Sequence, residues 1–142
     1  MPHKFSFKDW IFPVFFIIFG LLISLGPLLL FKTCAYCCCL DEVPVCHYAA
    51  RAELGTGIII VVLGICFFVF PDPKTRLGLT VGIFFSGIIA LLIPHLLIGG
   101  CDEKTMTCHL VTYPILTLIS VLVLVLSVLA MIFLDRRTRE IN

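Results

Sequence analysis

Four long runs without a charged residue limit what this chain can fold into. They lie at Trp10–Phe31, Leu54–Phe70, Leu77–Gly100 and Leu110–Leu134, and hold 22, 17, 24 and 25 residues. A helix needs about 20 residues to cross a bilayer core of roughly 30 Å, so three runs span it unaided. The second reaches that length if its helix begins near Tyr48, with Arg51 and Glu53 at the interface. We predict spans at about 10–31, 48–70, 77–100 and 110–134, joined by outer loops at 32–53 and 101–109.

The composition supports a membrane protein. Hydrophobic residues make up 61% of the chain and charged residues only 13%, which is more apolar surface than a soluble domain can bury. Backbone polar groups in lipid need internal partners, so the runs are expected to be helices. The sequence therefore predicts one all-α, polytopic membrane domain in contact with lipid. A formal net charge of +1 does not fit nucleic-acid binding.

Positive charges predict the orientation. One side of the predicted topology carries seven Lys and Arg residues, namely Lys4, Lys8, Lys74, Arg76, Arg136, Arg137 and Arg139. The other side carries only Lys32, Arg51 and Lys104. The excess places both termini and the 71–76 turn in the cytoplasm, and both outer loops outside the cell membrane. The first run is also too long for a cleaved signal peptide.

An internal repeat relates the two halves of the chain. Residues 39–47 and 101–109 both read C-x6-C-H. Gly20, Pro27 and Cys34 recur 67 positions later as Gly87, Pro94 and Cys101, and Cys46-His47 recur 62 positions later as Cys108-His109. We interpret this as two helical hairpins of the same orientation, forming a four-helix bundle. Gly20, Gly26 and Pro27 predict close packing and a mild kink in the first span.

Cysteines dominate the predicted outer loops. Seven of the eight are there: Cys34, Cys37, Cys38, Cys39, Cys46, Cys101 and Cys108. Our leading interpretation is a disulfide-braced cap, with Cys101 bonded to Cys108 and Cys46 bonded to one of the first four. An odd number leaves one cysteine unpaired or linked to a partner. Cys66, within the second span, is expected to be an inert small hydrophobe.

Two alternatives use the same residues. Cys34-Ala-Tyr-Cys37 is a CxxC motif, and the layout is similar to quinone-linked, disulfide-generating oxidoreductases; Cys34 and Cys37 would then be catalytic. The second alternative is a zinc, copper or iron site formed by Cys46, His47, Cys108 and His109. Adjacent Cys and His side chains diverge on a helix, which disfavours that set. His95 is a further candidate ligand, although an interface histidine is favoured there.

Charged and catalytic motifs are scarce in the spans. Arg51 and Glu53 point to different sides of a helix, and Glu53 either pairs with Lys32 or is solvated at the interface. The runs themselves carry no charged residue, which argues against a proton-coupled transporter acting alone. No P-loop, G-x-S-x-G or H-E-x-x-H occurs. Enzymatic activity is therefore less expected than a binding role.

Several stretches resemble a family of small four-span bacterial membrane proteins of uncharacterised function. They are Val45–Gly57, with its Cys-His and Ala-Glu-Leu-Gly elements, and the later Ile98–Cys101 and Met106–His109. The resemblance runs from Pro27 to Pro114, and the Cys37–Cys39 cluster is an unusual feature. It implies a bacterial plasma-membrane protein that accompanies export-type ABC transporters.

The combined expectation is a non-enzymatic membrane protein with a disulfide-braced extracytoplasmic cap. It would act as an accessory or interaction subunit beside another membrane protein or a second copy of itself. No cofactor is expected in this interpretation. A quinone or a zinc, copper or iron ion belongs to the two alternatives.

Overall fold

The described part of the chain is entirely helical. The computed structural model describes residues 7–26, 45–97 and 113–141, and no strand occurs among them. Its α-helices are α1 (Phe7–Leu25), α2 (Val45–Val69), α3 (Pro73–Leu92) and α4 (Tyr113–Ile141). A short π-helix, η2 (Ile93–Leu97), continues α3. The predicted all-α fold with four helices is confirmed.

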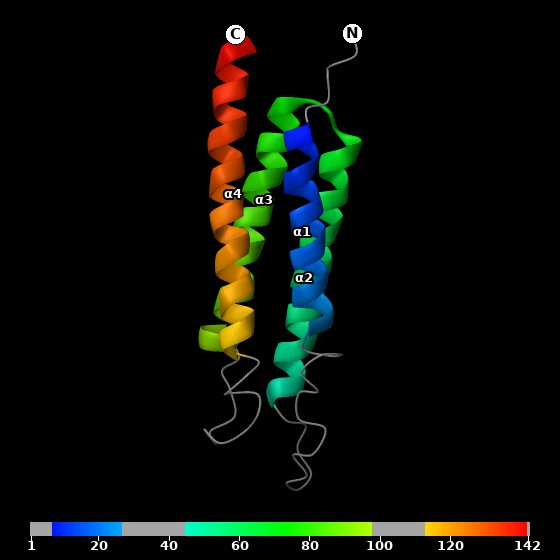
Figure 1. The fold of residues 1–142 in the computed structure, drawn as a ribbon. Coiled ribbons are helices and arrows are strands. Elements are labelled where there is room, and N and C mark those ends of the chain that lie inside the picture. Colours follow the sequence, from blue (N-terminus) through cyan, green and yellow to red (C-terminus); the bar gives the residue numbers. More distant parts are fainter. Residues whose placement is uncertain (1–6, 27–44, 98–112, 142) are drawn as a thin grey trace, which may run out of the picture.

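Each helix runs antiparallel to the helices next to it, which gives an up-down-up-down bundle. The start of α1, the α2–α3 turn at residues 70–72 and the end of α4 lie at one end, which we call the turn end (Figure 1). The opposite end, where α1 and η2 finish and α2 and α4 begin, is the loop end. Contacts join α1 to α2, α2 to α3, α3 to α4 and α4 to α1. This cyclic pattern puts α2 and α4 at opposite corners.

The helices are long and apolar enough for a membrane. Within the described residues, three segments qualify as membrane spans by length and composition: Tyr48–Val69, Pro73–Leu96 and Pro114–Glu140. The described apolar part of α1, Trp10–Leu25, is shorter. Large apolar side chains cover the outside of the bundle, including Leu118 at 63% exposure. Such a surface suits contact with lipid rather than with water. The cytoplasmic placement of the termini stays a prediction.

Helices α1 and α2 cross with their backbones almost in contact. A Cβ atom on Gly57 would lie 2.5 Å from the Ser24 backbone nitrogen and 2.7 Å from the Gly20 carbonyl oxygen. A Cβ on Gly20 would lie 2.8 Å from Cγ2 of Val61. Small residues permit this approach, as they commonly do between membrane helices. Glycine is therefore required at the crossing because backbone, rather than flexible side chain, faces it.

The structure repeats itself as the sequence predicts. Buried residues of α1 and α3 correspond at the predicted offset of 67: Phe16 with Ile83, Gly20 with Gly87 and Ile23 with Ala90. Gly26 and Ile93, also 67 apart, both adopt π-helical conformation immediately before a proline. Both hairpins therefore change helix type at this position, whereas the kink expected at Gly26 and Pro27 stays a prediction because Pro27 lies outside the described residues.

The second helices of the two hairpins correspond at an offset of 63. The nearest neighbour of Gly20 is Val61 and that of Gly87 is Leu124, and these two differ by 63 positions. Buried Glu53 and Leu116 have the same separation. The Cys-His pairs are 62 apart, one residue fewer. The offset that relates the packed residues of α2 and α4 is therefore one residue longer than the offset that relates the Cys-His pairs.

Arg76 holds together the connection between α2 and α3 at the turn end. Its side chain is only 5% exposed, and Nε donates a hydrogen bond of 3.0 Å to the Phe70 carbonyl oxygen. The guanidinium carbon lies 5.0 Å from the Phe67 ring centroid. A cation bonded to the carbonyl group of Phe70, the residue after α2, also complements the negative C-terminal end of that helix. The sequence predicts Arg76 as a charge in the cytoplasmic turn; instead it belongs to α3 and is buried.

We expect Arg76→Met to lower the free energy of unfolding by about 2 kcal/mol, because it removes a charge-assisted hydrogen bond and a cation–π contact. Reversible unfolding in mixed detergent micelles can be followed through Trp10, the single tryptophan, whose ring centroid lies 5.3 Å from that of Phe68 on α2. Lys74→Met, at an exposed position nearby, is the control and should change little. Equal stability of both variants would contradict a structural role for Arg76.

Candidate functional site

Most of the sequence-predicted site residues lie outside the described residues. These are Cys34, Cys37, Cys38, Cys39, Cys101, Cys108 and His109. Cys46 and His47 belong to the first turn of α2, but their side chains are also outside the described part. The disulfide-braced cap, the redox pair and the Cys/His metal set therefore remain predictions. Cys66, which is described, is a partly buried thiol that forms no disulfide.

His95 joins two helices at the loop end. Its Nε2 atom lies 3.0 Å from Oγ1 of Thr117, which connects η2 to α4. The two residues before it, Ile93 and Pro94, are buried, whereas His95 itself is exposed. This geometry favours the interpretation of His95 as a structural residue at the interface.

Glu53 corrects two expectations from the sequence. It is 1% exposed, so it is not a solvated interface charge, and it lies within the segment Tyr48–Val69 that is apolar enough to span a membrane. Glu53, Gly57, Ile60 and Gly64 recur at helical spacing and form the packed face of α2. An ionisable residue therefore does occur inside a span. The charge-free run begins only at Leu54, so the sequence places Glu53 at the interface; its predicted partner Lys32 lies outside the described residues.

Two buried side chains leave polar atoms without partners. Neither carboxyl oxygen of Glu53 has a hydrogen bond within the described structure, nor has Oγ of Ser120, which is 0% exposed. Other buried hydroxyl groups bond their own helix: Oγ of Ser127 donates to the Val123 carbonyl oxygen at 2.7 Å, and Oγ1 of Thr80 to that of Arg76 at 2.8 Å. Unpaired polar atoms are costly in an apolar interior, so Glu53 and Ser120 stand out.

Glu53 and Ser120 lie within about one helical turn of each other along the bundle axis. All α-helices have the same rise per residue. From a known contact between two antiparallel helices, an equal number of residues counted toward the same end of the bundle therefore leads to residues at similar height on both. Gly82 approaches Leu63 across α2 and α3; ten residues toward the loop end on each helix lead to Leu92 and Glu53. Nε2 of His95 contacts Oγ1 of Thr117; three residues from these toward the turn end lead to Leu92 on α3 and Ser120 on α4. Both unpaired side chains thus lie near the level of Leu92, on the diagonally opposite helices α2 and α4.

The backbone is irregular at that same level. Leu92 directly precedes η2, and Pro94 within η2 has no N–H to donate to an upstream carbonyl group. On α1, Gly57 approaches both Gly20 and Ser24. Four residues further toward the loop end, Glu53 is near the level of the last described residues of α1, which end at the π-helical Gly26. π-Turns within α-helices often occur at functional sites. We call Glu53, Ser120 and the two π-turns the polar level.

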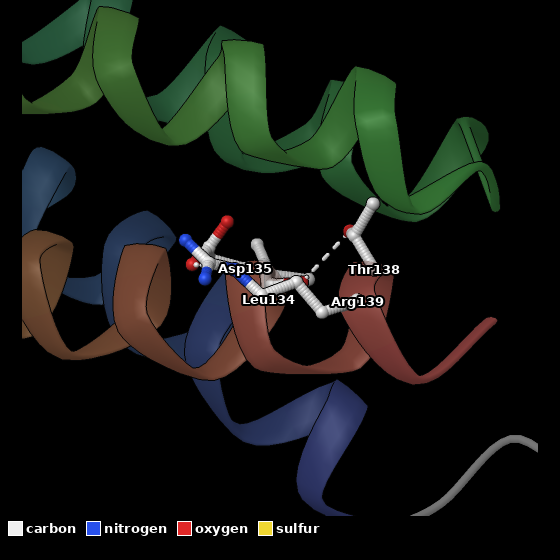
Figure 2. A network of polar contacts seen from close by, with 4 residues as sticks. All are labelled: Leu134, Asp135, Thr138 and Arg139. Carbon is white, nitrogen blue, oxygen red and sulfur yellow. Dashed lines mark hydrogen bonds and ion pairs between the residues drawn. The ribbon is translucent and has the colours of Figure 1, made fainter. Parts of the chain in front are cut away.

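The opposite end of the molecule is charged. Beyond Leu134, which is buried, α4 continues as helix and extends past the α2–α3 turn (Figure 1). Nε of Arg139 lies 3.0 Å from Oδ2 of Asp135 one helical turn away, and Oγ1 of Thr138 donates to the Leu134 carbonyl oxygen at 2.8 Å (Figure 2). We call residues 135–140 the charged end.

Comparison with known families identifies the chain. A family model described as Domain of unknown function (DUF4418) matches residues 16–133, which is most of the 142-residue chain. The chain belongs to this family. The predicted membership in an uncharacterised family is therefore confirmed. Comparison with curated proteins and with solved structures finds no match.

The DUF4418 match includes the polar level but stops before the charged end. Glu53, Leu92 and Ser120 fall within residues 16–133, whereas Asp135 to Glu140 follow them. The sequence contained a signal for Glu53, because its spacing from Gly57 and Gly64 places it on the small-residue face. It contained no signal for Ser120. Ser127 lies on the same face of α4 and is buried in the same way, but its hydroxyl group donates to the Val123 carbonyl oxygen, whereas that of Ser120 has no partner. Within the described DUF4418 residues, no three His, Cys, Asp or Glu side chains gather as metal ligands.

Proposed function

We propose that this DUF4418 protein is a non-enzymatic subunit that binds another membrane protein through the charged end of α4. The observation that supports the proposal is the continuation of α4 as helix beyond the packed bundle. Asp135, Arg136, Arg139 and Glu140 are all exposed there. Apolar packing does not account for these turns, whereas the Arg139–Asp135 pair contributes only a few tenths of a kcal/mol, about 0.3–0.5.

The chemistry of the charged end indicates what kind of partner fits. Three arginines oppose two acids between residues 135 and 140, a formal excess of one positive charge. Arginine side chains bind carboxylates with two parallel hydrogen bonds, so an acidic surface at the same membrane face is the complementary partner. The resemblance noted above makes an export-type ABC transporter the first candidate. The disulfide-braced cap at the loop end belongs to the same proposal.

Photo-crosslinking in native membranes tests this role. A photoreactive amino acid is placed at Arg136 or Glu140, and separately at Val125, a half-exposed residue in the apolar middle of α4. We expect one discrete protein adduct from positions 136 and 140, identified by mass spectrometry as a membrane protein other than this chain. Position 125 should give lipid adducts only.

Charge reversal provides the specificity control. Arg136→Glu with the photoreactive residue at position 140 should abolish most of the adduct, because the acidic partner surface would then be repelled. Adducts only with lipid, or only with a second copy of this chain, would overturn the proposal. An adduct unchanged by charge reversal would also overturn it.

A further inference from the structure

The polar level holds oxygen atoms that the fold itself does not use. The two carboxyl oxygens of Glu53 and the hydroxyl oxygen of Ser120 come from opposite corners of the bundle, are buried, and have no hydrogen-bond partner among the described residues. Such atoms normally find protein or water partners. From this arrangement we infer that Glu53 and Ser120 line a binding site for a monovalent alkali cation, a role separate from the charged end of α4.

Charge balance favours a cation of single charge. A carboxylate held inside a membrane-spanning bundle needs a counter-charge, and intramembrane ionisable groups commonly mark ion sites. None of the described basic residues can supply it at this level. Arg51 is on an exposed face of α2, and Arg76 is at the turn end. Nε2 of His95 contacts Thr117. One carboxylate is neutralised by one monovalent ion, whereas a divalent ion would leave an excess charge in a medium of low dielectric constant.

The donor atoms favour a hard cation. Carboxylate and hydroxyl oxygens suit alkali and alkaline-earth ions, while transition metals prefer imidazole and thiolate. The π-turns at Gly26 and at η2 add backbone carbonyl groups at the same level. Interrupted helices supply such carbonyl oxygens to sodium in transporters built from repeats. The polar level combines these features in one place.

The duplicated half shows that packing does not require an acid here. Leu116 occupies the position in α4 that corresponds to Glu53, and it is 5% exposed in the same bundle. A leucine therefore fills an equivalent site. The carboxyl group of Glu53 is therefore not needed to fill space in the first hairpin.

Equilibrium binding of radioactive sodium to the full-length protein in lipid nanodiscs tests the inference directly. Choline replaces sodium in the blank buffer, and unlabelled NaCl or KCl serves as competitor. We expect saturable, stoichiometric binding to the wild type. Glu53→Gln should reduce the affinity by about tenfold or more, which corresponds to at least about 1.4 kcal/mol. Ser120→Ala should reduce it by about fivefold, the effect of losing one neutral oxygen contact.

Ser127→Ala is the matched control, because Ser127 lies two turns from Ser120 on the same face and bonds its own backbone. Its sodium affinity should equal that of the wild type. Circular dichroism and size-exclusion profiles verify that each variant is folded. Absence of saturable sodium or potassium binding to the wild type would overturn the inference, as would equal losses in the two serine variants. An infrared band of a neutral carboxyl group that disappears in Glu53→Gln, without cation binding, would assign a proton to the site instead.

Discussion

Gly57→Ala is expected to lower the free energy of unfolding of the bundle by about 3 kcal/mol, at the upper end of the usual cost of overpacking. The added methyl group would lie 2.5 Å from the backbone nitrogen of Ser24 and 2.7 Å from the carbonyl oxygen of Gly20. Backbone atoms cannot rotate away as a side chain can. Helices α1 and α2 must therefore separate along their whole crossing, which also weakens the packing of Phe16 and Ile60 in the core.

Gly55→Ala separates this steric effect from helix propensity. No atom lies within 4 Å of a Cβ built on Gly55, which is two residues away on the exposed side of α2. Alanine should stabilise the helix there by up to about 1 kcal/mol. Reversible unfolding in mixed micelles, reported by Trp10, measures both variants. If Gly57→Ala were as stable as Gly55→Ala, the close α1–α2 crossing would be incorrect.

The second large effect has the opposite sign. In a sodium-free choline buffer, Glu53→Leu is expected to raise the free energy of unfolding by about 1–3 kcal/mol, the usual cost of a buried polar group without a partner. Leucine and glutamate have similar helix propensities, so the change reports the environment of the side chain. Leu116 shows that this bundle accepts leucine at the corresponding position. The same micelle unfolding measurement applies.

Two further variants check the origin of that gain. Glu140→Leu removes an exposed acid from the charged end and should leave stability nearly unchanged. Leu116→Glu should destabilise the bundle, since it adds a second buried acid. Sodium should narrow the difference between wild type and Glu53→Leu, because an ion that binds only the folded wild type stabilises it. A loss of stability in Glu53→Leu would indicate that the carboxyl group has a protein partner.

Helix content and the duplicated organisation could be predicted from sequence because they depend on spacing alone. Charge-free runs of sufficient length fix the number of helices. The recurrence of Gly20 and Pro27 as Gly87 and Pro94 is enough to pair the first helix of each hairpin, and the structure places corresponding residues in corresponding surroundings. The change to π-helical geometry at Gly26 and Ile93 was less accessible, since proline predicts a distortion but not its type.

Burial of individual polar residues could not be predicted in the same way. Whether Glu53 faces lipid, solvent or protein depends on the rotation of α2 about its axis, and a single charge at the edge of an apolar run carries little information on that rotation. The burial of Arg76 is unpredictable for a related reason, because α3 begins as early as Pro73 and places the Arg76 side chain over the ring of Phe67. The oxygen of Ser120 is distinguished only by what surrounds it in three dimensions.

The two hairpins are fastened differently, and this has a mechanical consequence. In the first, main chain meets main chain at Gly57 and Gly20, whereas in the second Gly87 faces side-chain atoms of Leu124 and Val123. The first pair is therefore expected to move as a stiff unit. The second can adjust its spacing through a change of the Leu124 rotamer. Any motion that opens a route to Glu53 is thus expected to be carried by α3 and α4, with the first hairpin as its fixed frame.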